Sequence, residues 1–574
     1  MTANVLLLAL LAAPPEWVER SNNHARVLLE VDAKFGPEGA GRLGVEGVDE
    51  KITDLSAGAN ERAKQAYREA AQTLRSRLQS EQDPKVRQDL EILIRAAELR
   101  VRGSEVNEKH LLPYADMVGL VFQGLRALLD DQVPEARRRA ALVRLRRYAG
   151  MEEGYQPILR LAEQRVREKL PRKHLWGPFR SRVEQDLANA RLFLEGIEPL
   201  FAKYKIDGYQ EALGKWKEQA AAYQDFVRKE ILPRSRTDFR LPPELYKLNL
   251  ENVGVDLPPA ELARRARAAF QTIQGQMQPL SLQVAKEQGW SLHDYRDVIK
   301  ELKKQQLVGE AILPHYQKRL AEIEQIVRRE NLVTLPERQA RIRIATPAES
   351  AAGPAPNMRP PRLVGNTGEM GEFVLPLNIP DPSGKMQSYD DFTFAAASWT
   401  LIAHELRPGH ELQFASVVEK GVSTARAVYA FNSTNVEGWG LYSEWVMQPF
   451  LPPEGQLIAL QHRLLRAARA FLDPELQMGK VIREQATRVL TSYVVLSDAM
   501  ARQEVERYTF RMPGQATAYF YGYTRLLEIR EEAARKMGSA FQPKKFHDFL
   551  LSQGLIPPGL LRQAVFEEFV RAGS

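Results

Sequence analysis

Residues 59–101 read ANERAKQAYREAAQTLRSRLQSEQDPKVRQDLEILIRAAELRV. Alanine, leucine and isoleucine recur there at spacings of three and four residues, among arginine, lysine, glutamate and glutamine. That spacing gathers the apolar side chains on one face of an α-helix and leaves the charged ones facing water. The stretch therefore predicts amphipathic helix.

The same pattern extends over most of the chain and predicts a mostly α fold. Proline and glycine separate the helical stretches, as at Leu257-Pro258-Pro259. Further stretches of this kind cover residues 115–149, 155–169, 181–203, 208–231, 259–288 and 315–330.

One segment, residues 345–388, is instead rich in proline and glycine. Within it, the run EFVLPL at residues 372–377 predicts a short strand, the small β element of the fold. Pro376 lacks a backbone donor, so we expect this strand at a sheet edge or in an irregular position. The alternative is a long surface loop. Long loops in compact domains tend to be functional, which favours a substrate-lining edge here.

The composition limits the chemistry that the chain can perform. The 574 residues are 44% hydrophobic, which is enough for a large core. The absence of cysteine excludes disulfides and thiolate metal sites, so a metal must be held by His, Asp, Glu or water. The net charge of +7 is a modest bias for this length. The densest basic stretch clusters too weakly for a nucleic-acid footprint and predicts a solvated helix face; it comprises Arg137, Arg138, Arg139, Arg144, Arg146 and Arg147.

The N-terminus contains a short apolar run, Val5 to Ala13. It has the length of a signal-peptide core and is too short to span a bilayer. No Lys or Arg precedes it, and Pro14 fits poorly after a cleavage point, so a buried helical turn is the alternative. We favour residues 1–13 as a signal peptide and export over a cytoplasmic location. No later stretch reaches transmembrane length.

The chemistry is concentrated in residues 399–413, WTLIAHELRPGHELQ. In the HExxH zinc motif, two histidines four residues apart share a helix face, and the intervening glutamate is the general base. Here His410 follows His404 by six residues, which is about 240° around an unbroken helix. The Pro408-Gly409 step can break the helix and bring His410 to the place of a fourth-residue histidine.

We therefore interpret this segment as an expanded zinc motif. It assigns His404 and His410 as ligands of Zn²⁺ and Glu405 as the general base. The alternative is two helix histidines with ordinary packing roles.

A second segment, residues 432–445, reads NSTNVEGWGLYSEW. It offers Glu437 as the third metal ligand, leaving the fourth position for water. Glu444 and Asn432 are the candidates for supporting contacts to the ligands. Gly438 and Gly440 lower helix propensity and predict the close approach of another backbone. The alternative for Glu437 is a surface carboxylate, although its apolar flanks favour a buried helix.

A third segment, residues 513–530, reads PGQATAYFYGYTRLLEIR. Tyr519 can stabilise the oxyanion of a tetrahedral intermediate, and Arg530 can bind a substrate carboxylate. The two lie within about 20° on one helix face. Gln515 and Tyr521 are further substrate-binding candidates. The alternative for all four is ordinary helix packing.

Together these segments resemble the bacterial domain-of-unknown-function 885 family. The shared patterns are HExxPGH from His404, EGWxLYxE from Glu437 and PGQAxxYxxG from Pro513. The pattern FHDxxLxxGxxP from Phe546 resembles the end of that family, and residues 43–47 fit its start more loosely. The resemblance therefore spans nearly the whole chain.

The family is similar to HExxH-type zinc metallopeptidases with a glutamate as third ligand. The resemblance implies a largely helical, clamshell-like fold, frequent export, and a role for His547 beside Tyr519 at the oxyanion. Two positions depart from the family pattern, Glu411 and Gln477, where histidine is usual. Neither is a proposed ligand, but both put substrate contacts and rate in doubt.

The sequence thus predicts a zinc-dependent hydrolase that cleaves short peptides as an exo- or oligopeptidase. An N-terminal helical region, residues 14–258, precedes a helical catalytic region, residues 259–574, in one continuous fold. Two alternatives stay open: a zinc hydrolase of non-peptide amides or esters, and a catalytically impaired helical binding protein. We expect a short peptide partner, no nucleic acid and no membrane span, whereas the oligomeric state is left open.

Overall fold

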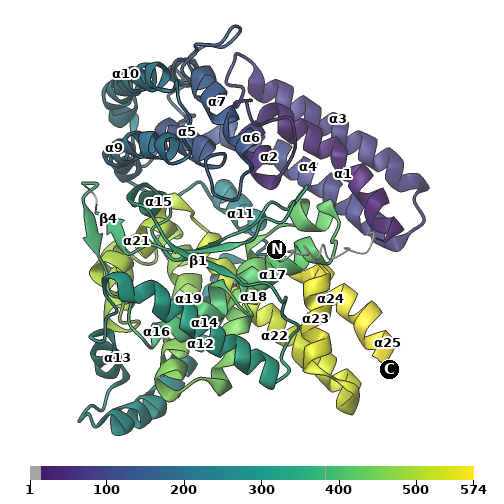
Figure 1. The fold of residues 1–574 in the computed structure, drawn as a ribbon, viewed down its shortest axis with the longest axis vertical. Coiled ribbons are helices and arrows are strands. Elements are labelled where there is room, and N and C mark those ends of the chain that lie inside the picture. The colour runs from purple at the N-terminus through teal and green to yellow at the C-terminus, as the bar shows by residue number, and fades with distance from the viewer. Residues whose placement is uncertain (1–14, 382, 574) are drawn as a thin grey trace, which may run out of the picture.

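The computed structural model describes residues 15–381 and 383–573, so the candidate signal peptide lies outside the described residues. Helices dominate the fold, and the mostly α prediction with a small β element is confirmed. In Figure 1 the helices α1 to α10 form the upper part of the molecule, and most later elements lie below them. None of the described helices is long and apolar enough to cross a membrane.

The first ten helices account for the amphipathic pattern read from the sequence. Helix breaks divide some of the predicted stretches. Residues 59–101, for example, form parts of two helices, because Asp83 caps α4 and Pro84 begins it. The helices are α1 Glu16–Phe35, α2 Pro37–Leu43, α3 Ala59–Ser80, α4 Pro84–His110, α5 Met117–Arg126, α6 Glu135–Arg138, α7 Ala140–Tyr148, α8 Ile158–Arg167, α9 Arg180–Lys203 and α10 Gln210–Phe226.

The remaining helices surround the segment that carries the zinc-like motif. They are α11 Pro243–Asn252, α12 Pro259–Gln288, α13 Tyr295–Lys303, α14 Ile312–Arg329, α15 Pro347–Ala352, α16 Ala397–Glu405, α17 His410–Glu419, α18 Ser433–Met447, α19 Pro453–Gln477, α20 Arg483–Ser492, α21 Asp498–Glu506, α22 Ala518–Met537, α23 Pro543–Ser552, α24 Pro558–Ala564 and α25 Arg571–Gly573. Two short π-helical turns matter below, η4 Ala425–Tyr429 and η6 Arg507–Arg511.

The strands form two small sheets. The strands are β1 Arg341–Ile344, β2 Asn357–Arg359, β3 Glu372–Leu375, β4 Asn378–Pro380 and β5 Met386–Ser388. In the first sheet β3 lies between β1, to which it is parallel, and β2, to which it is antiparallel. The expectation of an edge strand or surface loop at 372–377 is therefore wrong. The strand ends at Leu375, before Pro376, so the missing proline donor is not needed in the ladder.

The buried apolar residues form two main clusters. The larger one joins α1, α3 and α4 to the helices that follow residue 246. The smaller one is built mainly from residues 112–231. The division of the chain at residue 258 stays a prediction.

The arginine-rich stretch near residue 140 is not simply a solvated face. Arg144 is 1% exposed and donates to the carbonyl oxygens of Gly124 and Val48. Arg137 forms two hydrogen bonds with Asp49. The expectation was wrong for these positions because Arg144 joins α7 to α5 and to the loop after α2, and Arg137 joins α6 to the same loop.

Candidate metal centre

A break in the helix separates the two histidines of the zinc-like motif. Helix α16 ends at Glu405, and α17 begins at His410 after the cis Arg407-Pro408 peptide. At Gly409 a Cβ atom would lie 1.9 Å from the carbonyl oxygen of His404. Only glycine allows the chain to turn back so closely on the end of α16.

Helix α18 holds this break in place. The indole Nε1 of Trp439 donates to the carbonyl oxygens of Pro408, at 3.0 Å, and Gly409, at 3.2 Å. The Pro408 carbonyl lies in the break and accepts no helical backbone bond, whereas the Gly409 carbonyl also accepts from the backbone nitrogen of Gln413 at 3.0 Å. Trp439 therefore ties the turn between the histidines to the helix that carries Glu437.

The three predicted ligands converge on one point. His404 Nε2 lies 3.6 Å from Glu437 Oε2, and His410 Nε2 lies 3.3 Å from the same oxygen. One ligand atom from each of the three residues lies within 4.8 Å of the others. Zinc bonds near 2 Å separate neighbouring ligand atoms in a tetrahedral site by about 3.4 Å. The donor set and its spacing therefore fit a zinc ion.

Gly440 provides space for the two imidazole rings. A Cβ atom at this position would lie 2.7 Å from Cε1 of His404 and 2.8 Å from Cε1 of His410. The sequence predicted another backbone against Gly438 and Gly440. This is correct for Gly438, which meets the backbone of Gly522 on α22, but wrong for Gly440, which faces the histidines.

The ring of His404 is oriented by a buried carboxylate. Its Nδ1 lies 2.7 Å from Glu444 Oε1, and the other oxygen of Glu444 accepts from the Thr400 hydroxyl at 2.7 Å. Burial would raise the pKa of Glu444, but Arg466 and His404 hold it at about 2. An ionised carboxylate at Nδ1 leaves Nε2 of His404 directed at Glu437.

The electrostatics of the centre favour a cation. Burial would lower the pKa of His404, but the carboxylates of Glu437 and Glu444 outweigh it and raise the pKa to about 9. Burial would also raise the pKa of Glu437, yet the two histidines hold it well below its ordinary value. The point between the three side chains therefore attracts positive charge.

Glu405 lies beside the ligands as a buried carboxylate. Glu405 is 7% exposed and forms no hydrogen bond or ion pair with any described residue. Burial raises its pKa above the ordinary value. A carboxylate without a fixed partner next to a metal site is suited to exchange protons.

Tyr519 on α22 stacks against His404, with 6.3 Å between ring centroids and 18° between planes. Arg507 Nη2 donates to its hydroxyl oxygen at 2.9 Å. Because arginine only donates, the phenolic hydrogen of Tyr519 stays free for another acceptor. Arg507 also donates to Oε1 of Gln515, so Gln515 lies behind the tyrosine as its indirect support.

Three other predicted residues lie around this centre without contacting the ligand atoms. Asn432 caps α18 by accepting from the backbone nitrogen of Asn435 at 2.8 Å. His547 lies 2.9 Å from the Tyr442 hydroxyl and 2.8 Å from the Leu332 carbonyl oxygen. The Arg530 guanidinium lies over Trp445, 5.2 Å from the ring centroid, about 16 Å along α22 from Tyr519.

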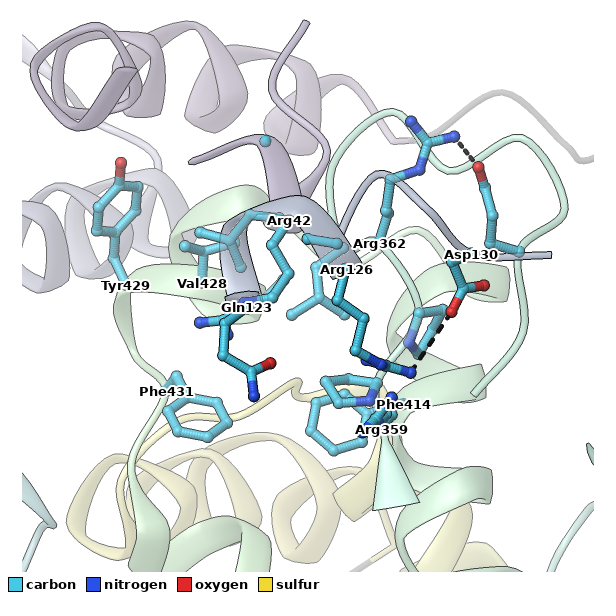
Figure 2. A pocket seen from close by; sticks show the side chains of 18 of the residues that line it. Arg42, Gln123, Arg126, Asp130, Arg359, Arg362, Phe414, Val428, Tyr429 and Phe431 are labelled. Atoms are coloured by element: carbon cyan, nitrogen blue, oxygen red, sulfur yellow. Dashed lines mark ion pairs between the residues drawn. The ribbon is translucent and has the colours of Figure 1, made fainter. Parts of the chain in front are cut away.

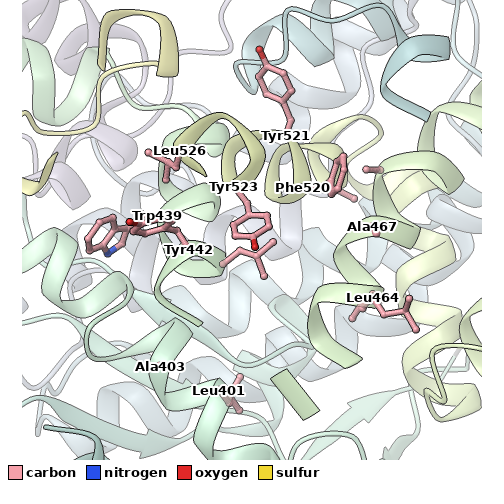
Figure 3. Packing of buried hydrophobic residues seen from close by; sticks show 14 of the residues in the cluster. Leu401, Ala403, Trp439, Tyr442, Leu464, Ala467, Phe520, Tyr521, Tyr523 and Leu526 are labelled. Carbon is pink, nitrogen blue, oxygen red and sulfur yellow. The ribbon is translucent and has the colours of Figure 1, made fainter. Parts of the chain in front are cut away.

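Tyr521 points away from Tyr442 and Tyr523, as Figure 3 shows. Its hydroxyl donates to Asp256. The structure thus brings together His404, His410, Glu437, Glu405, Glu444 and Tyr519, and it does not bring Arg530 or Tyr521 to them. Their roles in substrate binding stay predictions.

Glu411 and Gln477, which depart from the family pattern, both form hydrogen bonds within the protein. Glu411 is buried and accepts from Arg407 Nε at 2.8 Å and from Arg338 Nη1 at 2.7 Å. Gln477 accepts from the backbone nitrogen of Leu241 and donates to the Tyr508 carbonyl oxygen, both at 2.9 Å.

No role was predicted for the basic residues behind Tyr519. The guanidinium groups of Arg466, Arg469 and Arg507 lie 5.8, 4.5 and 5.2 Å from the centroid of its ring. Arg463, Arg466 and Arg469 follow a three-residue spacing within helix α19, and all three are buried. Charged residues at that spacing in a buried helix were the signal that could have identified them.

A comparison with known protein families agrees with the resemblance that the motifs at His404, Glu437 and Pro513 indicated. The family described as bacterial protein of unknown function (DUF885) matches residues 37–565. The chain belongs to this family. Among curated proteins, none matches this DUF885 chain.

Two solved structures share the fold of this DUF885 protein. One is a candidate lipoprotein from Colwellia psychrerythraea, with a TM-score of 0.75 and 18% identity over 96% of this chain and 99% of that one. The other is a candidate lipoprotein of unknown function from Shewanella oneidensis, with a TM-score of 0.69 and 17% identity over 96% of this chain and 100% of that one. At these identities the likeness concerns the fold alone.

Proposed function

We propose that this DUF885 protein is a zinc-dependent hydrolase that cleaves peptide bonds in short peptides. The observation that carries the proposal is the convergence of His404 Nε2 and His410 Nε2 on Glu437 Oε2, at 3.6 and 3.3 Å. Two neutral imidazoles and one carboxylate are the ligand set of zinc peptidases that keep a fourth position for water.

When bound, zinc would lower the pKa of a water molecule and polarise a substrate carbonyl. His404, His410 and Glu437 would hold the ion. Glu405 accepts a proton from the attacking water and passes it to the leaving amine. The free phenolic hydrogen of Tyr519 donates to the oxyanion, and Arg507 fixes the direction of that hydroxyl.

The burial of the centre supports a short substrate. His404 and His410 are buried, and Glu437 is the most exposed ligand. A folded protein does not reach such a site, whereas an extended peptide of a few residues fits a cleft. We therefore propose an exo- or oligopeptidase.

We also propose that the protein is exported. The apolar run Val5–Ala13 supports this, as does the description of both structural neighbours as candidate lipoproteins.

The test is hydrolysis of a mixed peptide library by the full chain after chelator treatment and after reconstitution with Zn²⁺. We expect one zinc per chain and activity only in the reconstituted protein. Glu405→Gln should keep its zinc but lose about 10²- to 10⁴-fold in kcat. Glu531→Gln, at an exposed position of α22, is the matched control and should behave as wild type.

Equal cleavage by wild type and Glu405→Gln would overturn the assigned base. A parallel panel of amides and esters separates peptidase action from the hydrolysis of other substrates. Retained zinc without turnover of any substrate would favour the impaired binding protein.

A further inference from the structure

A cavity of about 970 Å³ lies between the first helices and the half of the chain that carries the metal centre. Its walls come from α2, α4, α5, β2, α17 and η4. Figure 2 shows this cavity with ten of its side chains labelled. The volume lies within the range of about 300–1,000 Å³ that is typical of ligand sites.

One of the three helices that carry the candidate metal ligands also borders the cavity. Phe414, in its wall, lies on α17 four residues after His410, about 6 Å along the helix axis. Phe431, also in the wall and 48% exposed, precedes Asn432, the cap of the helix that carries Glu437.

On one wall of the cavity the arginines are balanced by carboxylates. Arg126 and Arg359 both pair with Glu349, which also accepts two hydrogen bonds from Arg343. Burial would raise the pKa of Glu349, but these arginines hold it at about 2. Glu372 pairs with Arg343, and Asp130 lies 3.7 Å from Arg126, so three carboxylates neutralise the three guanidinium groups.

A further arginine in the wall has no partner. Arg42 is exposed and, among the described residues, forms no hydrogen bond or ion pair. The other wall arginines are paired: Arg137 with Asp49, Arg362 with Glu369, and Arg100 with Asp32. Arg42 can therefore bind an anion without breaking a contact of the folded protein.

The facing wall is apolar. Figure 2 shows Val428, Tyr429 and Phe431 across the cavity from Arg126, Arg359 and Arg362. Leu43 and Leu99 extend the apolar surface. The cavity therefore matches a ligand with a carboxylate at one place and an apolar side chain at another.

We propose that this cavity binds the carboxylate of a short acidic peptide, with Arg42 as the anion site and Phe431 against an apolar side chain. The carboxylate comes from an acidic side chain or from the peptide C-terminus. The turnover of such a peptide rests on the proposed hydrolase function, but its binding does not.

The test measures binding by calorimetry in the zinc-loaded Glu405→Gln protein, which prevents turnover. The probes are the pentapeptide Ala-Leu-Phe-Ala-Glu, its counterpart ending in Gln, and the C-terminal amide of each. Arg42→Glu should weaken binding of the Glu peptide about tenfold, and Arg42→Lys should restore most of it. Arg26→Glu, an exposed arginine of α1 outside the cavity, is the matched control and should stay within about twofold.

The amidated peptides and the Gln peptides identify which carboxylate is bound. Loss of affinity on amidation assigns the C-terminus, and loss on changing Glu to Gln assigns the side chain. Equal affinity of all four peptides, unchanged by Arg42→Glu, would overturn the proposal. If acidic peptides bind in an Arg42-dependent way and wild type cleaves none of them, the hydrolase proposal fails and the binding site stands. If wild type cleaves all four equally and Arg42→Glu has no effect, the hydrolase proposal stands and the binding site fails.

Discussion

The indole nitrogen of Trp439 lies 3.0 Å from the carbonyl oxygen of Pro408. This contact, with those from Trp439 to Gly409 and from Ser443 to Pro408, joins the helix that carries Glu437 to the break that separates His404 from His410. The three proposed metal ligands are therefore held together in part by a residue that is not one of them.

Trp439→Phe keeps an aromatic ring and removes the donor. We expect zinc binding to weaken by about 1 kcal/mol, which is about fivefold in affinity, because the Pro408 carbonyl loses its shorter hydrogen bond and keeps only the 3.4 Å one from Ser443. Zinc competition with a chromogenic chelator measures this change. Trp290→Phe is the control, because its indole makes no hydrogen bond within the described part of the chain. Equal zinc affinity in both variants would remove Trp439 from the support of the site.

Gly440→Ala places a methyl group against both imidazole rings, 2.7 and 2.8 Å from their Cε1 atoms. The rings must move, so we expect zinc affinity to fall by about tenfold or more while helix content is retained. Metal analysis and circular dichroism measure the two quantities. Gly214→Ala on α10 meets no atom within 4 Å and should raise the free energy of unfolding by about 0.5–1 kcal/mol. Full zinc binding by Gly440→Ala would contradict the packing described.

Glu411→Ala removes the buried carboxylate that Arg407 and Arg338 share, although Arg407 keeps Glu324 and Arg338 keeps Glu419. We expect the free energy of unfolding to fall by about 1.5–3 kcal/mol, as for the loss of a hydrogen bond to a charged group. Urea denaturation measures it. Glu419→Ala removes the partly exposed partner of Arg338 and should cost less than about 1 kcal/mol. Similar losses in the two variants would show that the Glu411 network adds no stability.

His547 should make the stability of the protein depend on pH. Burial lowers the pKa of His547 to about 4, below its ordinary 6.5, and outweighs the hydrogen bond to the Leu332 carbonyl, which would raise it. The unfolded chain therefore binds the proton first, and this part of the stability is complete above pH 6.5 and is lost as the pH falls toward 4. The full change is about 3 kcal/mol.

The measurement compares wild type with His547→Gln by urea denaturation between pH 7 and pH 4. The variant is expected to be less stable at pH 7, and the difference should shrink as the pH falls. A difference that stays constant with pH would mean that His547 does not carry this dependence.

Local patterns were sufficient for much of the fold. The stretch at residues 59–101 encodes its helices by residue spacing alone, and Asp83-Pro84 marks where one ends and the next begins. Neighbours in space decided what local patterns did not. The strand at Glu372–Leu375 is central because β1 and β2 pair with both of its edges, and Arg144 is buried because distant carbonyls surround it.

The order of His404, Glu405, Pro408, Gly409 and His410 along the chain already determined which side chains could form a metal centre, because proline and glycine must interrupt the helix between the histidines. The convergence itself depends on tertiary packing. Glu437 lies 27 residues after His410, and its place is set by Trp439 on the broken turn and by Gly438 against Gly522. Contacts between helices far apart in sequence follow from the shape of the packed core, and spacing along the chain does not encode that shape.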